Sequence, residues 1–166
     1  MQFHKERIEG NPDYERFKEL DTKKSDNVVR MIERAYKGGL RAAYALMDTW
    51  FVKAPLVCAV RKIGGGAVHV VGRLAMGKDR YAVGSRRYNV HELIALHGRE
   101  AVVCRKYKCM YFEQRVMMGD TCVKIFFIRV GRNKNWDAIV TTDTHMKFVE
   151  AFEIYQIRWN IEVLIK

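Results

Sequence analysis

Several features that would mark a common protein class are missing from this sequence. Its four cysteines include no Cys-x-x-Cys pair, and its five histidines include no His-Glu-x-x-His pair. These absences exclude the usual zinc-site patterns. No apolar run approaches the roughly 20 residues that span a bilayer, and residues 1–7 lack the apolar core of a signal peptide. We therefore expect a cytoplasmic protein with no membrane contact and with free thiols instead of a disulfide framework.

Acidic residues are too few to balance the basic ones. Lys and Arg number 30 against 19 Asp and Glu, which gives a net charge of +11. This balance favours a polyanionic partner such as nucleic acid, although ribosomal proteins, membrane-surface proteins and nucleases all share it. The length of 166 residues and the 49% hydrophobic content predict one domain with a substantial core.

The N-terminal part predicts a connector followed by a helix. Residues 1–24 are polar and charge-mixed, with no sustained hydrophobic period. Ser25 and Asp26 offer an N-cap, and apolar residues then recur at helical spacing as far as Gly38 and Gly39. We expect the fold to begin with this helix, and residues 1–24 to be a connector or the tail of a missing upstream core.

A strand-helix-strand unit is predicted next. Residues 40–50 form an apolar run typical of a buried strand, and Asp48 lies at its end. Pro55 suits the first turn of a helix that reaches Lys62, and residues 67–71 then predict a second strand. Such a unit usually pairs its two strands in parallel.

The middle of the chain, residues 73–132, predicts a basic insertion of antiparallel β-structure. Polar and apolar residues alternate there, with turn residues at 84–85 and 119–120. The runs 101–118 and 121–130 predict a long hairpin, and 90–96 a short helix. Beyond the insertion we expect a buried strand over 136–140, a helix cap at 141–144 that includes Asp143, and a closing helix.

The closing helix carries a polar line inside an apolar surface. Tyr155, Arg158, Glu162 and Lys166 recur at offsets of three and four residues, which places them on one stripe of a helix with apolar residues on both sides. A carboxylate buried beside an arginine is costly unless a pair, a metal or a phosphate compensates it. Spacing alone leaves a functional site and an ordinary internal ion pair equally open.

Two motifs carry a resemblance to a known family. Tyr155-x2-Arg158-x3-Glu162, preceded by the run Ala138-Ile-Val-Thr-Thr-Asp143, resembles the Tyr-Arg-Glu-Lys signature of bacterial insertion-sequence transposases of the Asp-Asp-Glu type. The run Ala45-Leu-Met-Asp-Thr-Trp-Phe51 is similar to that family's second catalytic aspartate, on a strand followed by an aromatic residue. The spacing of the motifs suits a family member with a β-strand insertion.

The resemblance implies a fold and a chemistry. The fold class is α/β, with a partial ribonuclease-H-like core over 25–166 and the antiparallel insertion within it. The activity that the resemblance implies is metal-dependent phosphodiester hydrolysis and strand transfer at transposon ends. Asp48 and Glu162 would be catalytic and would hold Mg²⁺, with two ions in a complete site and Mn²⁺ as a substitute. Tyr155 and Arg158 would contact phosphates or bases.

The sequence departs from the family at both ends. No acidic residue before Asp48 lies at the end of an apolar strand, so the family's first aspartate has no counterpart. The signature's lysine falls beyond Lys166. We therefore expect a truncated C-terminal part of a catalytic core, whose classification as an enzyme stays open.

Partners follow from the resemblance and from the basic insertion. The family implies double-stranded DNA, both transposon ends and target, bound by a homodimer in the bacterial nucleoid. Within the insertion we assign DNA contacts to Arg86, Arg87, Lys106 and Lys108, which alternate with aromatic residues. A solvated β face that is charged for solubility is the alternative.

Three functions remain open from the sequence. The first is a fragment of a transposase catalytic core. The second is a DNA-binding remnant without catalysis, and the third is a ribonuclease-H-like nuclease unrelated to transposition.

Overall fold

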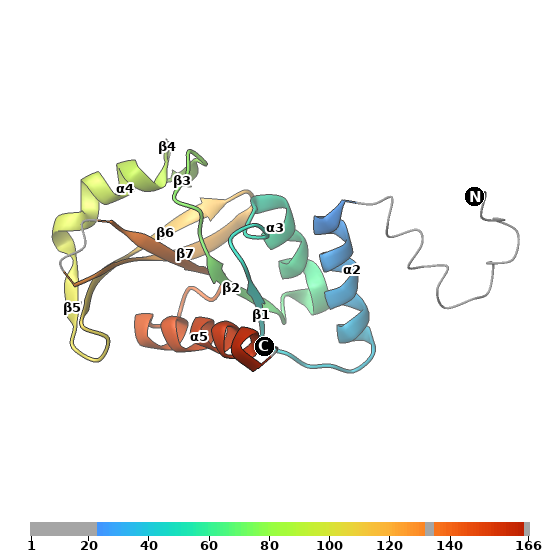
Figure 1. The fold of residues 1–166 in the computed structure, drawn as a ribbon. Coiled ribbons are helices and arrows are strands. Elements are labelled where there is room, and N and C mark those ends of the chain that lie inside the picture. The colour runs from blue at the N-terminus through green and yellow to red at the C-terminus, as the bar shows by residue number, and fades with distance from the viewer. Residues whose placement is uncertain (1–22, 132–134, 165–166) are drawn as a thin grey trace, which may run out of the picture.

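The protein has a mixed α/β fold built on one open, mostly antiparallel sheet. A computed structural model describes residues 23–131 and 135–164, with side chains described as far as Arg158. This part contains eight strands and four α-helices (Figure 1). The strand order is β1-β2-β8-β7-β6-β3-β4, and β5 also pairs with β6. No helix among the described residues is both long and apolar enough to cross a bilayer.

The helices and strands have the following bounds. The helices are α2 (Lys24–Lys37), α3 (Ala54–Lys62), α4 (Val90–His97) and α5 (Phe148–Leu164). The strands are β1 (Tyr44–Met47), β2 (His69–Arg73), β3 (Tyr81–Val83), β4 (Arg86–Tyr88), β5 (Val102–Cys104), β6 (Cys109–Met118), β7 (Thr121–Val130) and β8 (Asp137–Thr141).

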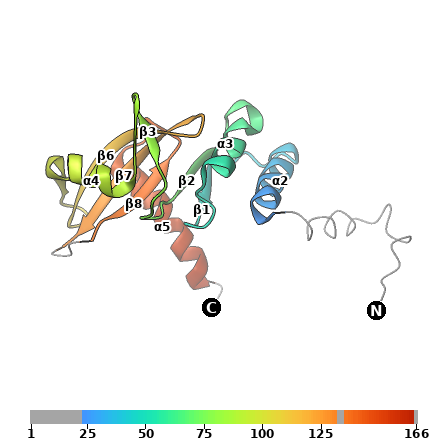
Figure 2. The same cartoon turned by 90° about the horizontal axis from the view of Figure 1, so that it is seen from above.

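Helices cover both faces of the sheet and create two apolar cores. Helix α5 lies along one face of the sheet (Figure 1). Its residues Phe148, Ala151 and Tyr155 pack there with Phe126 of β7. Helices α3 and α4 bury their apolar residues against the opposite face, which includes Phe127. Helix α2 lies outside α3, on the side of the molecule near β1 (Figure 2). Adjacent residues of a strand point to opposite faces, so β7 serves both cores.

The predicted strand-helix-strand unit is confirmed. Strands β1 and β2 pair in parallel, and α3 connects them along the chain. Pro55 lies in the first turn of that helix. Strand β1 is shorter than the predicted strand over residues 40–50, because the residues at both ends of that apolar run lie outside the sheet. Leu40 is 62% exposed and Trp50 is 85% exposed. A continuous apolar run does not reveal which of its members face solvent.

The first helix is confirmed, but its predicted cap is wrong. Helix α2 begins at Lys24 and ends before Gly38, and its N-cap residue is Lys23. No side chain caps it, while Ser25 and Asp26 lie inside its first turn. The predicted connector falls outside the described residues as far as position 22.

The antiparallel β-structure predicted within residues 73–132 is confirmed, with one correction. Strands β6 and β7 form the long hairpin around Gly119, and the expected short helix is α4. The run 101–118 is two strands instead of one, because residues 105–108 turn the chain between β5 and β6. Lys108 lies in this turn with a φ of 49°, in the left-handed region. A lysine rarely adopts this conformation, so the sequence does not indicate a turn here.

Candidate functional site

Asp48 lies immediately after β1, at the end of the parallel pair. Its carbonyl oxygen accepts a hydrogen bond from the Phe51 N–H at 2.9 Å, which closes a four-residue turn. The Asp48 Oδ1 accepts another from the Thr49 N–H at 2.7 Å. The Asp48 side chain is still 49% exposed. This carboxylate is therefore held by the turn and is open to solvent and to a ligand.

Helix α5 brings the predicted polar stripe to the same place. Arg158 Nη1 lies 3.9 Å from Asp48 Oδ2, although 109 residues separate the two in sequence. The Arg158 guanidinium also lies 5.4 Å from the centre of the Tyr155 ring, a cation–π distance. The segment that carries Asp48 and the helix that carries Arg158 therefore meet in space.

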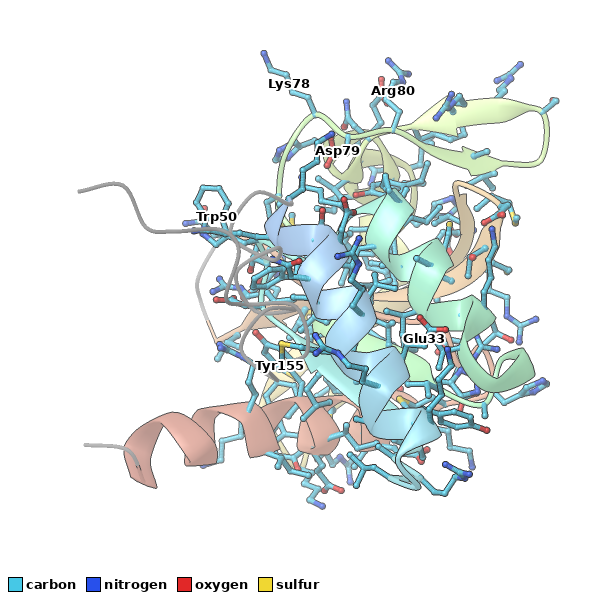
Figure 3. The ribbon with its side chains drawn as sticks, turned by 90° about the vertical axis from the view of Figure 1, so that its right-hand side faces the viewer. Glu33, Trp50, Lys78, Asp79, Arg80 and Tyr155 are labelled. Atoms are coloured by element: carbon cyan, nitrogen blue, oxygen red, sulfur yellow. The ribbon has the colours of Figure 1, made fainter. Side chains whose placement is uncertain are left out.

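Tyr155 has a different environment from Arg158. It is 6% exposed and packs in the core beneath α5. Its buried hydroxyl has no hydrogen-bond partner among the described residues. Figure 3 shows the residue between α5 and the body of the protein. Its position suits a residue that supports Arg158 from below better than one that touches a ligand directly.

Glu162 belongs to α5, but its side chain lies outside the described residues. Residues four apart share a face of an α-helix, so position 162 follows Arg158 one turn further along the same face.

A hollow of about 440 Å³ adjoins Asp48. It is bounded by α2, by β1 with the following turn, and by Arg158 of α5. The α2 wall is apolar and consists of Val28 and Ile32. Among the described strands, β1 pairs only with β2, so the hollow follows the unpaired edge of the sheet. Backbone groups on such an edge are available to a further strand.

Arg73 also belongs to this region, although the sequence predicts it only as part of the basic insertion and not of the Asp48 site. It ends β2, and its guanidinium contacts Asp137 through Nη2 at 2.9 Å and through Nε at 2.9 Å. The hydrogen bond to Asp137 raises the Arg73 pKa, and the charge of Asp48 contributes to the same shift. Met47 lies opposite Gly72 in the parallel register of β1 and β2, so Arg73 follows at the position next to Asp48.

The described residues around Asp48 supply a limited donor set for a metal. No group of three or more histidine, cysteine, aspartate or glutamate side chains converges in the described part of the chain. Asp137 pairs with Arg73 and Asp48 with Arg158, and both carboxylates are about half-exposed. Mg²⁺ in phosphate-processing sites commonly takes one or two carboxylates with water and substrate phosphates. Asp48 fits as one of these ligands.

The basic residues assigned to DNA lie on two separate hairpins. Arg86 and Arg87 are exposed on β4, the last strand of the sheet path, whereas Lys106 and Lys108 are exposed in the turn between β5 and β6 (Figure 1). Lys106 binds Glu153 of α5, and this contact raises the Lys106 pKa. The four residues therefore do not form one compact patch, and Lys106 joins its hairpin to α5.

Asp143 does not cap a helix, which corrects the prediction for residues 141–144. Helix α5 begins five residues later, at Phe148. Asp143 Oδ2 accepts a hydrogen bond from the Tyr44 hydroxyl at 3.2 Å, and Oδ1 accepts one from the His145 N–H at 3.0 Å. Burial opposes ionisation, but these hydrogen bonds and nearby His69 hold the Asp143 pKa below its ordinary value. Its carboxylate secures the loop that leads into α5.

Gly72 allows the close approach of the segments that support Asp48. A Cβ at this position would lie 2.5 Å from Val52 Cγ2 and 2.8 Å from the Met47 carbonyl oxygen. We expect Gly72→Ala to lower the free energy of unfolding by about 1–3 kcal/mol, a typical cost of overpacking. Urea denaturation measures this change. Gly77→Ala is the matched control, because a Cβ there meets nothing within 4 Å. Equal stability of the two variants would contradict the prediction.

Comparisons with known proteins find no matching family model, no matching curated protein and no matching solved structure.

Proposed function

We propose that this chain is part of the catalytic core of a DNA transposase of the Asp-Asp-Glu type, with a partial ribonuclease-H-like fold. The observation that carries the proposal is the contact between Asp48 and Arg158, which unites the two motifs of the resemblance at one end of the parallel strands. The α/β architecture with an antiparallel insertion supports it as well.

Asp48 and Glu162 are the proposed metal ligands. Arg158 contacts Asp48, positions four apart share a face of an α-helix, and carboxylate oxygens suit hard divalent cations; these three points support the pairing. Bound Mg²⁺ would supply Lewis-acid activation of a nucleophile and stabilise the leaving oxygen at phosphorus. The proposal requires a divalent ion at Asp48, and iron-directed cutting of the chain next to Asp48 is its test.

Arg158 is the proposed phosphate-binding residue. Its side chain is 20% exposed and faces the hollow beside Asp48, and a guanidinium can bind a phosphate through two parallel hydrogen bonds. Tyr155 lies beneath it and fixes its position. Among the described strands, β1 pairs on one side only, and such an edge can accept a further strand of the proposed core.

Arg86 and Arg87 are proposed to bind the DNA backbone. We expect Arg86→Ala/Arg87→Ala to reduce the slope of log K against log salt by about 1–2, because each lost phosphate contact removes about 0.9. Fluorescence anisotropy with a labelled duplex at several salt concentrations measures the slope. The double variant Lys37→Ala/Lys62→Ala removes the same charge from other exposed sites. An equal change in both double variants would show that net charge acts without a contact at β4.

The second candidate is a DNA-binding remnant without catalysis. In this function the contact between Asp48 and Arg158 is an ion pair, and the exposed basic residues of β4 bind the DNA backbone. DNA binding without iron-directed cutting at Asp48 would support this function over the first.

A further inference from the structure

Cys104 and Cys109 face each other across the hairpin of β5 and β6. They are direct partners in its antiparallel register, and the turn of residues 105–108 separates them in sequence. Side chains of directly opposite residues point to the same face of a sheet, and both cysteines pack in the core beneath α5. Both are free thiols. The hairpin therefore ends in a pair of neighbouring, buried thiols.

The register brings the two cysteines to disulfide spacing. Direct partners in an antiparallel pair have Cα atoms about 4.5 or 5.5 Å apart, according to the type of pair. Disulfides bridge Cα atoms about 4.4–6.8 Å apart, so either type of pair suits the bond. Burial raises the pKa of Cys109 to about 11, and a hydrogen bond with Cys104 adds to this shift. The two sulfur atoms therefore lie within reach of each other.

The strand that carries Cys104 is weakly held. Strand β5 has three residues and, among the described strands, pairs only with β6. Its Val102 and Val103 are 53% and 66% exposed, whereas Cys104 is 7% and Cys109 is 3% exposed. A short edge strand that buries few apolar side chains opens locally at low cost. Such an opening gives a small oxidant access to both thiols.

The turn between the cysteines holds α5. Lys106 binds the Glu153 carboxylate, and the Tyr107 hydroxyl donates a hydrogen bond to Glu153 Oε1 at 2.8 Å. The Tyr107 ring also lies 4.5 Å from the ring of Phe152. The same helix carries Arg158. A covalent bond that fixes this turn therefore restricts the helix that reaches the Asp48 site.

We propose that Cys104 and Cys109 are a reversible disulfide site, which a small-molecule disulfide oxidises and which then locks the turn of residues 105–108 against α5. One cysteine thiolate attacks the small disulfide and expels half of it as a thiolate. The other cysteine attacks the resulting mixed disulfide and expels the second half. The two cysteine protons pass to the released thiolates, so two protein thiols are oxidised and one small disulfide is reduced to two thiols. This site goes beyond the proposed function, because it needs neither DNA nor a metal.

Peptide mapping tests the bond in the unmodified chain. The reduced protein is equilibrated with mixtures of reduced and oxidised glutathione, alkylated, and digested with trypsin without reduction. Trypsin cleaves after the basic residues of the turn, so Cys104 and Cys109 fall in separate peptides, residues 100–105 and 109–115. We expect these peptides to become linked, with the loss of two hydrogen atoms, and to separate again in dithiothreitol. Cys122 is the internal control, because it is exposed and should form only a mixed disulfide with glutathione.

Hydrogen exchange measured by mass spectrometry tests the link to α5. In the oxidised protein we expect amides of the turn and of residues 150–156 to exchange about threefold to tenfold more slowly than in the reduced protein. Glu153→Ala should still form the disulfide but lose the slower exchange of α5, because Lys106 and Tyr107 lose their partner. Cys109→Ser should show neither change under the same oxidant.

Several results would overturn the proposal. One is full alkylation of Cys104 and Cys109 in the most oxidising mixture. Another is a bond from either cysteine to Cys58, to Cys122 or to a second copy of the chain, which a non-reducing gel detects. If the disulfide forms but α5 exchanges equally in both states, the lock on α5 is wrong. None of these results bears on the proposed function, which rests on the contact at Asp48.

Discussion

Phe126→Ala is expected to lower the free energy of unfolding by about 3–5 kcal/mol, the usual cost of truncating a buried phenylalanine. Phe126 has no exposed surface, and its ring lies 5.8 Å from the ring of Phe148, the first residue of α5. Loss of this ring leaves a cavity between β7 and α5. The helix that carries Tyr155 and Arg158 should therefore loosen before the rest of the protein unfolds.

The neighbouring residue provides a matched control for this prediction. Phe127 is equally buried on the same strand, but it faces the other core and stacks on Phe112 with ring centres 4.6 Å apart. Phe127→Ala should cost a similar free energy in urea denaturation. Native-state hydrogen exchange distinguishes the two variants, since α5 amides should exchange faster only in Phe126→Ala. Equal exchange of α5 in both would contradict the independence of the two cores.

Elements with strong local signals could be predicted from sequence. Gly119 and Asp120 form a turn between two long alternating runs, and these are β6 and β7. Pro55 marks the first turn of α3. In each case the turn or helix-start chemistry and the hydrophobic period point to the same element, so local and tertiary preferences agree.

Elements whose bounds depend on tertiary contacts could not be predicted. Trp50 is exposed because it lies in the turn after Asp48, and no residue of the run 40–50 indicates from sequence that a turn begins there. Asp143 has the chemistry of a cap, but it bonds to the Tyr44 hydroxyl, 99 residues away in sequence. A polar residue before a helix can satisfy its oxygen atoms with any nearby donor, and only the fold decides which donor is nearby.

The candidate site shows the same division. The stripe of Tyr155 and Arg158 could be predicted from its helical period, and the position of Asp48 from the end of an apolar run. The contact between Asp48 and Arg158 could be expected only from the family resemblance, because no hydrophobic periodicity relates two elements so far apart in the sequence. Arg73 was absent from the predicted site, because its place depends on the register of β2 beside β1. The separation of the two basic hairpins also depends on sheet order.

The second large effect is expected for the metal. When Fe²⁺ replaces Mg²⁺ in the presence of ascorbate and peroxide, hydroxyl radicals form at the bound ion and cut the nearby backbone. We expect cuts around residues 47–49 and within 155–162, the two segments that meet at the Arg158 contact. Asp48→Asn should abolish both cuts and lower the affinity for Mn²⁺ by at least about tenfold, because the site loses an anionic oxygen ligand.

The control for this variant is Asp79→Asn, which removes an exposed carboxylate that is paired with Lys53. It should leave the iron-directed cuts and the Mn²⁺ affinity unchanged. Asp48→Asn should also alter the free energy of unfolding by no more than about 1 kcal/mol, because its contact with Arg158 is long and the carboxylate is half-exposed. Loss of metal binding with preserved stability would identify Asp48 as a ligand. Unchanged cutting in Asp48→Asn would instead reduce the Asp48–Arg158 contact to a structural ion pair and remove the metal from the proposed function.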